Sequence, residues 1–122
     1  MIDNRANIHK GAKLAKDVKV EAFATIYEDV EIGSGSWIGP NTVIMNGSRI
    51  GKNVQVFPGA VISGDPQDMK YQGEVTTAEI GDNTIILEFV TINKGTKANE
   101  RTVVGKDCLI MSYVHIAHDC VL

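Results

Sequence analysis

A period of six residues runs through almost the whole chain and constrains its fold more than any other feature. Counted from Ile8 in steps of six, seventeen of the twenty positions reached are Ile, Leu or Val. Two residues before each of them lies a second column of small or β-branched residues, among them Ala24, Thr42 and Ala60. Neither the 3.6-residue period of an α-helix nor the two-residue alternation of a strand produces a strict period of six.

One large and one small inward-facing residue in every six describe short strands joined by sharp corners. Three such strands make a triangular coil, and coils stack through parallel strand pairing at a spacing of about 4.8 Å. We therefore predict an all-β chain folded as a left-handed parallel β-helix of hexapeptide repeats, with about six triangular coils. Glycine often follows the large aliphatic residue, as at Gly33 and Gly81, and we expect such glycines to form corners with a positive φ angle.

Two segments break the period. Asp68 and Glu74 stand where the aliphatic column continues, which predicts an external loop near residues 64–78. A shorter excursion is predicted at 97–101, because Ala98 replaces an aliphatic residue there. Loops that project from a rigid scaffold often carry binding groups, so the polar side chains of the first loop are candidate ligand contacts.

Length and composition exclude several classes of protein. The 122 residues are enough for one domain, predicted over 1–122. A net charge of −3 gives no reason to expect nucleic-acid binding. No apolar run approaches the length of about 18 residues that a membrane span requires, and the first five residues lack the apolar core of a signal peptide. We expect a cytoplasmic protein.

The two cysteines, Cys108 and Cys120, both fall in the small inward column. They lie twelve residues apart, which places them on different walls of the triangle, beyond the roughly 7 Å Cα separation that a disulfide allows. We expect both to be unpaired, buried and inert as small hydrophobic residues.

Two histidines near the end of the chain, His115 and His118, are candidates for acid–base chemistry. The inward positions around them are Val114 and Ile116, so both imidazoles are predicted to point outward. Imidazole titrates near neutral pH and suits a general base, and the neighbouring Asp119 is a candidate for orienting the ring. The alternative is that these are ordinary surface histidines, as we expect for His9.

The segment 115–120, with the sequence HIAHDC, resembles the signature of the UDP-N-acetylglucosamine O-acyltransferases, a family of hexapeptide-repeat acyltransferases. Segments 1–3, 67–74, 79–82 and 90–96 are similar to the same family, in the same order and with similar spacing. The resemblance covers the whole chain and corresponds to the N-terminal half of the family's proteins. It implies that further coils and a C-terminal helical domain are absent from this chain.

The resemblance implies transfer of a 3-hydroxyacyl group from acyl carrier protein to the glucosamine 3-hydroxyl of UDP-N-acetylglucosamine, the first step of lipid A biosynthesis. It implies a homotrimer that acts without a metal or a bound cofactor. The implied catalytic residues are His118, as the general base, and Asp119, as its support. The implied substrate-binding residues are Gln67, Asp68, Lys70 and His115.

Several points stay open at this level. Asn93 stands where many family members carry a histidine, and the part of the family that this chain lacks holds further site residues. The basic residues Lys94, Lys97, Arg101 and Lys106 form either a patch for the acidic carrier protein or an ordinary solvated face. Other functions compete with this reaction. The nearest are those of other hexapeptide acyltransferases, such as the N-acyltransferase of the same pathway or the acetyl-coenzyme A-dependent sugar acetyltransferases, which the sequence of the first loop disfavours. The others are a non-enzymatic β-helix scaffold and a zinc-dependent β-helical carbonic anhydrase with His115 and His118 among its ligands.

Overall fold

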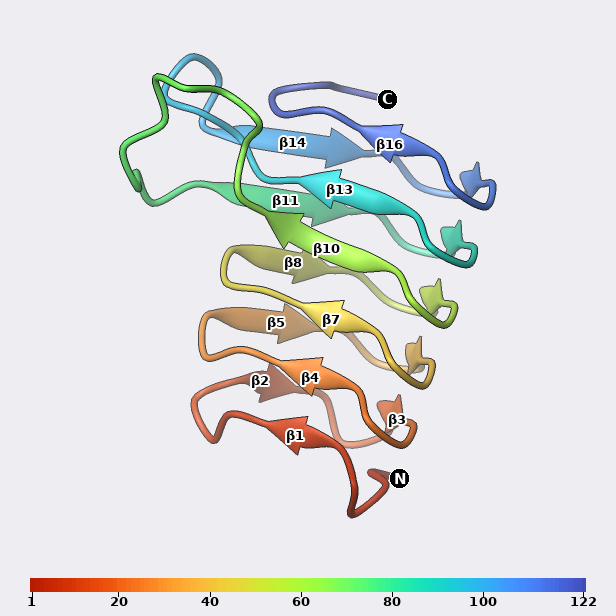
Figure 1. Ribbon diagram of the computed structural model, residues 1–122. Helices are drawn as coiled ribbons and strands as arrows, with labels where there is room; N and C mark the ends of the chain where they lie inside the picture. Colours follow the sequence, from red (N-terminus) through yellow and green to blue (C-terminus); the bar gives the residue numbers. More distant parts are fainter.

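The computed structural model describes all 122 residues and consists of short parallel strands joined by turns (Figure 1). The strands are β1 (Asn7–Ile8), β2 (Lys13–Leu14), β3 (Lys19–Val20), β4 (Thr25–Ile26), β5 (Val30–Ile32), β6 (Trp37–Ile38), β7 (Val43–Ile44), β8 (Ser48–Ile50), β9 (Gln55–Val56), β10 (Val61–Gly64), β11 (Thr77–Ile80), β12 (Ile85–Ile86), β13 (Thr91–Asn93), β14 (Arg101–Val104), β15 (Leu109–Ile110) and β16 (His115–Ile116). It contains no helix long and apolar enough to cross a membrane.

Every third strand belongs to the same sheet, so the chain has three walls. The first wall is β1-β4-β7-β10-β13-β16, the second is β2-β5-β8-β11-β14 and the third is β3-β6-β9-β12-β15. In Figure 1 the first wall lies in front and runs to the left, while the second lies behind it and runs to the right as the chain climbs. This winding is left-handed and confirms the predicted left-handed parallel β-helix.

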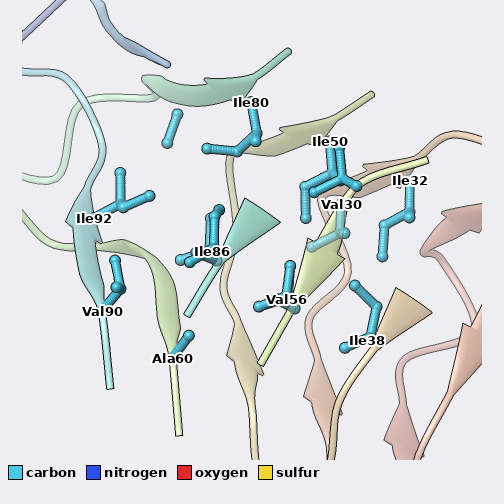
Figure 2. Close-up of a cluster of buried hydrophobic side chains, with 14 of the residues drawn as sticks. Val30, Ile32, Ile38, Ile50, Val56, Ala60, Ile80, Ile86, Val90 and Ile92 are labelled. Atoms are coloured by element: carbon cyan, nitrogen blue, oxygen red, sulfur yellow. The ribbon is translucent and has the colours of Figure 1, made fainter. Parts of the chain in front are cut away.

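The two sequence columns form the interior of the prism. In the first wall Ile26, Ile44, Ile62 and Ile92 stack in register from coil to coil, and each is essentially inaccessible to solvent. Figure 2 shows the same arrangement for the other two walls, whose aliphatic side chains face one another across the interior. The small column is also buried: Thr42, for example, is fully enclosed and donates its hydroxyl hydrogen to the carbonyl oxygen of Gly39 at 3.0 Å.

The glycines that follow the large aliphatic residues serve a different purpose from the one expected. Gly33 and Gly81 do not adopt a positive φ angle; that conformation occurs at four other glycines and at ten non-glycine residues, including Asn53. A Cβ atom at Gly33 would lie 2.7 Å from the carbonyl carbon of Gly51, and one at Gly81 would lie 2.6 Å from that of Gly105. These glycines are therefore required because the next coil packs directly against their backbone.

Both breaks in the period become loops at the same edge of the prism, where the chain passes from the first wall to the second. The first loop spans 65–76, between β10 and β11, and the second spans 94–100, between β13 and β14. The predicted bounds were slightly wide, because Gly64 ends β10 and Thr77 begins β11. The two loops lie side by side in Figure 1, and the Thr76 hydroxyl at the end of the first loop donates a hydrogen bond to the Gly95 carbonyl in the second.

Both cysteines are free, as predicted. Each is half-buried instead of fully buried, because Cys108 and Cys120 lie in the last coil, where no further coil of the chain covers them. Cys108 precedes β15 of the third wall, whereas Cys120 precedes Val121, which pairs with Val103 of the second wall. The two thiols thus sit on different walls.

Candidate active site

His118 and Asp119 lie at the edge that also carries both loops, directly after β16. Asp119 occupies the corner with a φ angle of 66°, a left-handed conformation that aspartate tolerates better than most residues. Its Oδ2 atom lies 2.9 Å from Nδ1 of His118. The two side chains are 31% and 16% exposed, respectively. The contact expected between the histidine and the carboxylate is therefore present.

The charge of Asp119 decides which nitrogen of His118 carries the hydrogen in the contact between them. Partial burial acts to raise the pKa of Asp119, but hydrogen bonds from Thr96 and His118 outweigh it and hold that pKa below the ordinary value for aspartate. An ionised carboxylate only accepts hydrogen bonds, so Nδ1 of His118 carries the hydrogen. The lone pair of the neutral ring is then on Nε2, the arrangement that a general base requires.

Thr96, in the second loop, supplies most of the remaining contacts to the carboxylate. Its N–H donates to Oδ1 of Asp119 at 2.8 Å, and its hydroxyl donates to Oδ2. The hexapeptide column places Thr96 among the inward strand positions, but the residue lies outside any strand. The only sequence signal near Thr96 is the loss of the aliphatic residue at Ala98. It marks the second loop but does not indicate that a residue of this loop contacts Asp119.

His115 belongs to β16, on the outer face of the first wall, and is exposed. Its Nδ1 atom lies 2.8 Å from Oγ1 of Thr91 on the adjacent strand β13. No hydrogen bond joins His115 to the pair formed by His118 and Asp119. The two histidines therefore point outward, as predicted, but have separate partners.

A groove of about 590 Å³ separates the first loop from the second. Its lining includes Asp68, Lys70, Tyr71, Gln72, Thr96 and Lys97. The Asp68 carboxylate accepts a hydrogen bond from the Lys70 N–H at 3.0 Å and so shapes the turn. Of the four predicted substrate-binding residues, Asp68 and Lys70 line this groove. Gln67 is exposed on the same loop outside the lining, and His115 lies on the wall.

Lys94, the first residue of the second loop, holds the first loop in place. Its Nζ atom lies 3.6 Å from Oδ1 of Asp65 and 5.8 Å from the centre of the Tyr71 ring. Its side chain is only 13% exposed. Arg101 is also paired, 3.5 Å from Glu79. The basic residues considered as a docking patch therefore do not form one free positive surface.

Asn93 ends β13 at the same edge and is 6% exposed. Its Oδ1 atom has no hydrogen-bond partner. A buried acceptor left unpaired costs about 1–3 kcal/mol.

No three His, Cys, Asp or Glu side chains of the chain come together in a group that could hold a metal ion. The carbonic anhydrase interpretation places its zinc ligands at a subunit interface. The zinc content of the purified protein is therefore the test of that interpretation.

Comparisons with known proteins agree with the hexapeptide-repeat fold described above. A family model described as bacterial transferase hexapeptide (six repeats) matches residues 29–64. An acyl-[acyl-carrier-protein]–UDP-N-acetylglucosamine O-acyltransferase from Xanthomonas oryzae pv. oryzae is 50% identical over 121 residues, which cover 98% of this chain and 46% of that protein. One from Chlorobium phaeobacteroides is 61% identical over 62 residues, which cover 51% of this chain and 24% of that protein.

Solved structures give the same result in three dimensions. The UDP-N-acetylglucosamine acyltransferase of Bacteroides fragilis superposes with a TM-score of 0.96 at 50% identity, covering 98% of this chain and 47% of that one. LpxA of Acinetobacter baumannii superposes with a TM-score of 0.97 at 37% identity, covering 99% of this chain and 47% of that one. The chain thus spans less than half the length of these relatives.

Proposed function

The chain is a relative of the UDP-N-acetylglucosamine O-acyltransferases, and from that premise we propose that it transfers a 3-hydroxyacyl group from acyl carrier protein to the 3-hydroxyl of UDP-N-acetylglucosamine. This reaction is the first step of lipid A biosynthesis. The observation that carries the proposal is the hydrogen-bonded pair of His118 and Asp119, beside a groove between two loops. Both residues of the pair lie in segment 115–120, whose sequence resembles the family signature.

The pair suits the chemistry of acyl transfer to an alcohol. A sugar hydroxyl is a poor nucleophile until a base removes its proton as the new bond forms. In the proposed reaction Nε2 of His118 takes that proton while the oxygen attacks the thioester carbonyl carbon. The carbon–sulfur bond then breaks, and the leaving thiolate takes the proton back from Nε2. Asp119 stabilises the imidazolium ion that exists between the two steps.

The groove supplies groups for the sugar nucleotide. Lys70 and Lys97 line it, and ammonium groups suit the diphosphate of such an acceptor. Gln67, Asp68 and His115 are the further substrate contacts in this proposal. No metal or cofactor takes part in it.

The proposal predicts product formation from defined substrates. With 3-hydroxyacyl carrier protein and UDP-N-acetylglucosamine, mass spectrometry should detect the acylated sugar nucleotide and an equal amount of free carrier thiol. Acetyl-coenzyme A in place of the carrier is the control, because other hexapeptide acyltransferases use it, and it should give no product. A folded protein that neither transfers the acyl group nor binds UDP-N-acetylglucosamine would contradict the proposal and favour a non-enzymatic scaffold.

A homotrimer is also part of the proposal. Exposed apolar side chains gather on and beside the third wall at Leu109, Met111, Phe89 and Tyr113. The rings of Phe89 and Tyr113 stack on each other, with their centroids 5.3 Å apart. Exposed apolar side chains that lie together, as these two rings do, favour association. Sedimentation equilibrium should therefore give three times the mass of one chain, and the mass of a single chain would contradict this part of the proposal.

We assign the protein to the cytoplasm within the same proposal. Cell fractionation is the corresponding measurement.

A further inference from the structure

We propose that Thr96 is a positioning residue for the base, holding the Asp119 carboxylate in the orientation that His118 requires. The inference rests on the proposed function, in which His118 accepts the proton of the sugar hydroxyl. Thr96 itself does not touch the reacting atoms in this proposal; it acts through Asp119.

The contacts of Thr96 fix the carboxylate at both oxygens. The N–H of Thr96 donates to Oδ1 at 2.8 Å, while its hydroxyl donates to Oδ2, the oxygen that faces Nδ1 of His118. The Thr96 hydroxyl also accepts a hydrogen bond from the Ala98 N–H at 3.2 Å, so its own hydrogen is free to point at Asp119. Thr96 is 6% exposed, and water therefore cannot easily replace its hydroxyl.

The backbone of Asp119 is held separately. Its N–H donates to Oγ1 of Thr102 at 2.9 Å, and its φ angle of 66° places it at the corner. The backbone contact locates the residue, but it leaves rotation of the side chain free. Only the two donors of Thr96 and the imidazole of His118 restrain the carboxylate itself.

Thr96 also connects the base to the groove. It lines the groove between the loops, whereas His118 and Asp119 do not. The preceding residue, Gly95, accepts a hydrogen bond from the Thr76 hydroxyl at the end of the first loop. Thr96 therefore contacts both the groove and Asp119. Because its hydroxyl donates to the carboxylate, removing that hydroxyl should alter the turnover step more than the binding of substrate.

Three variants distinguish an effect on the orientation of the Asp119 carboxylate from an effect on the fold as a whole. Thr96→Val keeps the shape of the side chain and removes the hydroxyl, whereas Thr96→Ser keeps the hydroxyl. Thr84→Val is the matched control, because Thr84 is fully buried and donates to the Gly105 carbonyl at 2.7 Å, in the third-wall repeat away from the catalytic pair. Kinetic constants and the pKa of Asp119, followed by carbon NMR of its carboxyl group, are measured for each.

We expect Thr96→Val to lower kcat by about ten- to a hundredfold, the effect of one hydrogen bond to a charged group, with KM nearly unchanged. Thr96→Ser should restore most of kcat, and Thr84→Val should leave it near the parent value. The pKa of Asp119 should rise in Thr96→Val, because a donor to the ionised form is lost, and should stay low in the other two variants. In a His118→Ala background, Thr96→Val should cause no further loss.

Two results would overturn the inference. One is an unchanged pKa of Asp119 in Thr96→Val, whether or not the protein is active. The other is a loss of kcat in Thr96→Val that is equally large in the His118→Ala background, because the effect would then not pass through His118. A raised pKa of Asp119 in Thr96→Val, together with a folded parent protein that neither transfers the acyl group nor binds UDP-N-acetylglucosamine, would overturn the proposed function while supporting the role of Thr96 in holding the carboxylate.

Discussion

Replacing His118 by alanine is expected to lower kcat for acyl transfer by about 10²–10⁴-fold, the usual contribution of a positioned general base. The ring is the only imidazole that contacts Asp119, and its removal leaves the sugar hydroxyl without a proton acceptor. The side chain is 31% exposed and lies outside the core columns. The variant should therefore fold and bind UDP-N-acetylglucosamine as the parent does. Steady-state kinetics and a binding isotherm on the same preparation measure the two quantities.

The other two histidines are the natural controls. His115→Ala removes a ring whose hydrogen-bond partner is Thr91, so we expect mainly an increase in KM. His9→Ala changes an exposed residue whose Nδ1 accepts from the Gly11 N–H in the first coil, and it should leave both constants unchanged. Equal losses of kcat in all three variants would contradict the assignment of the base, because they would point to a general effect on structure.

The fold could be predicted from the sequence because each repeat contributes the same local information. A buried position recurs every six residues, and parallel stacking brings equivalent residues into register without any long-range choice. The exception concerns the glycines. Their spacing was visible, but it did not distinguish a positive φ angle from close contact with the next coil, as found for Gly33 and Gly81.

The candidate site was only partly predictable. Its location was predictable, because both breaks in the period fall between a first-wall and a second-wall strand. Residues 118–119 likewise follow a first-wall strand, in the next coil. The contact of Thr96 with Asp119 was not predictable, since it spans 23 residues and depends on the path of an irregular loop. Lys94 is similar: its charge suggested a free surface, whereas the folded loop brings Asp65 and Tyr71 to it.

The position of the site has a physical reason. Residues inside the walls stack on the equivalent residues of the coils above and below, so a change there also disturbs those coils. An edge between two walls accepts additional residues, because strand pairing resumes after the insertion, as it does at β11 and β14. The regular stack therefore supplies a rigid base, and the loops add polar groups without disturbing it.

Truncating Ile62 to alanine is expected to destabilise the protein by about 2–5 kcal/mol, the range for removing a fully buried isoleucine side chain. Ile62 is completely inaccessible and stacks between Ile44 and Ile92 in the middle of the first wall. The substitution would therefore leave a cavity between the neighbouring coils, and these coils cannot move in to fill it because each is paired with the next. Ile62→Val should cost about 0.5–1.5 kcal/mol, which gives a graded series at one site.

Ile8→Ala is the matched control, because it makes the same chemical change in the same column. Ile8 lies in β1, at the edge of the first wall, where it pairs only with Ile26 and is partly exposed. Its truncation should therefore cost clearly less than that of Ile62. Urea unfolding measures both, and the midpoint should shift while the slope stays constant if only the native packing has changed. Equal losses at the two positions would contradict the view that each coil is stabilised chiefly by the coils on either side, since Ile62 has two such neighbours and Ile8 has one.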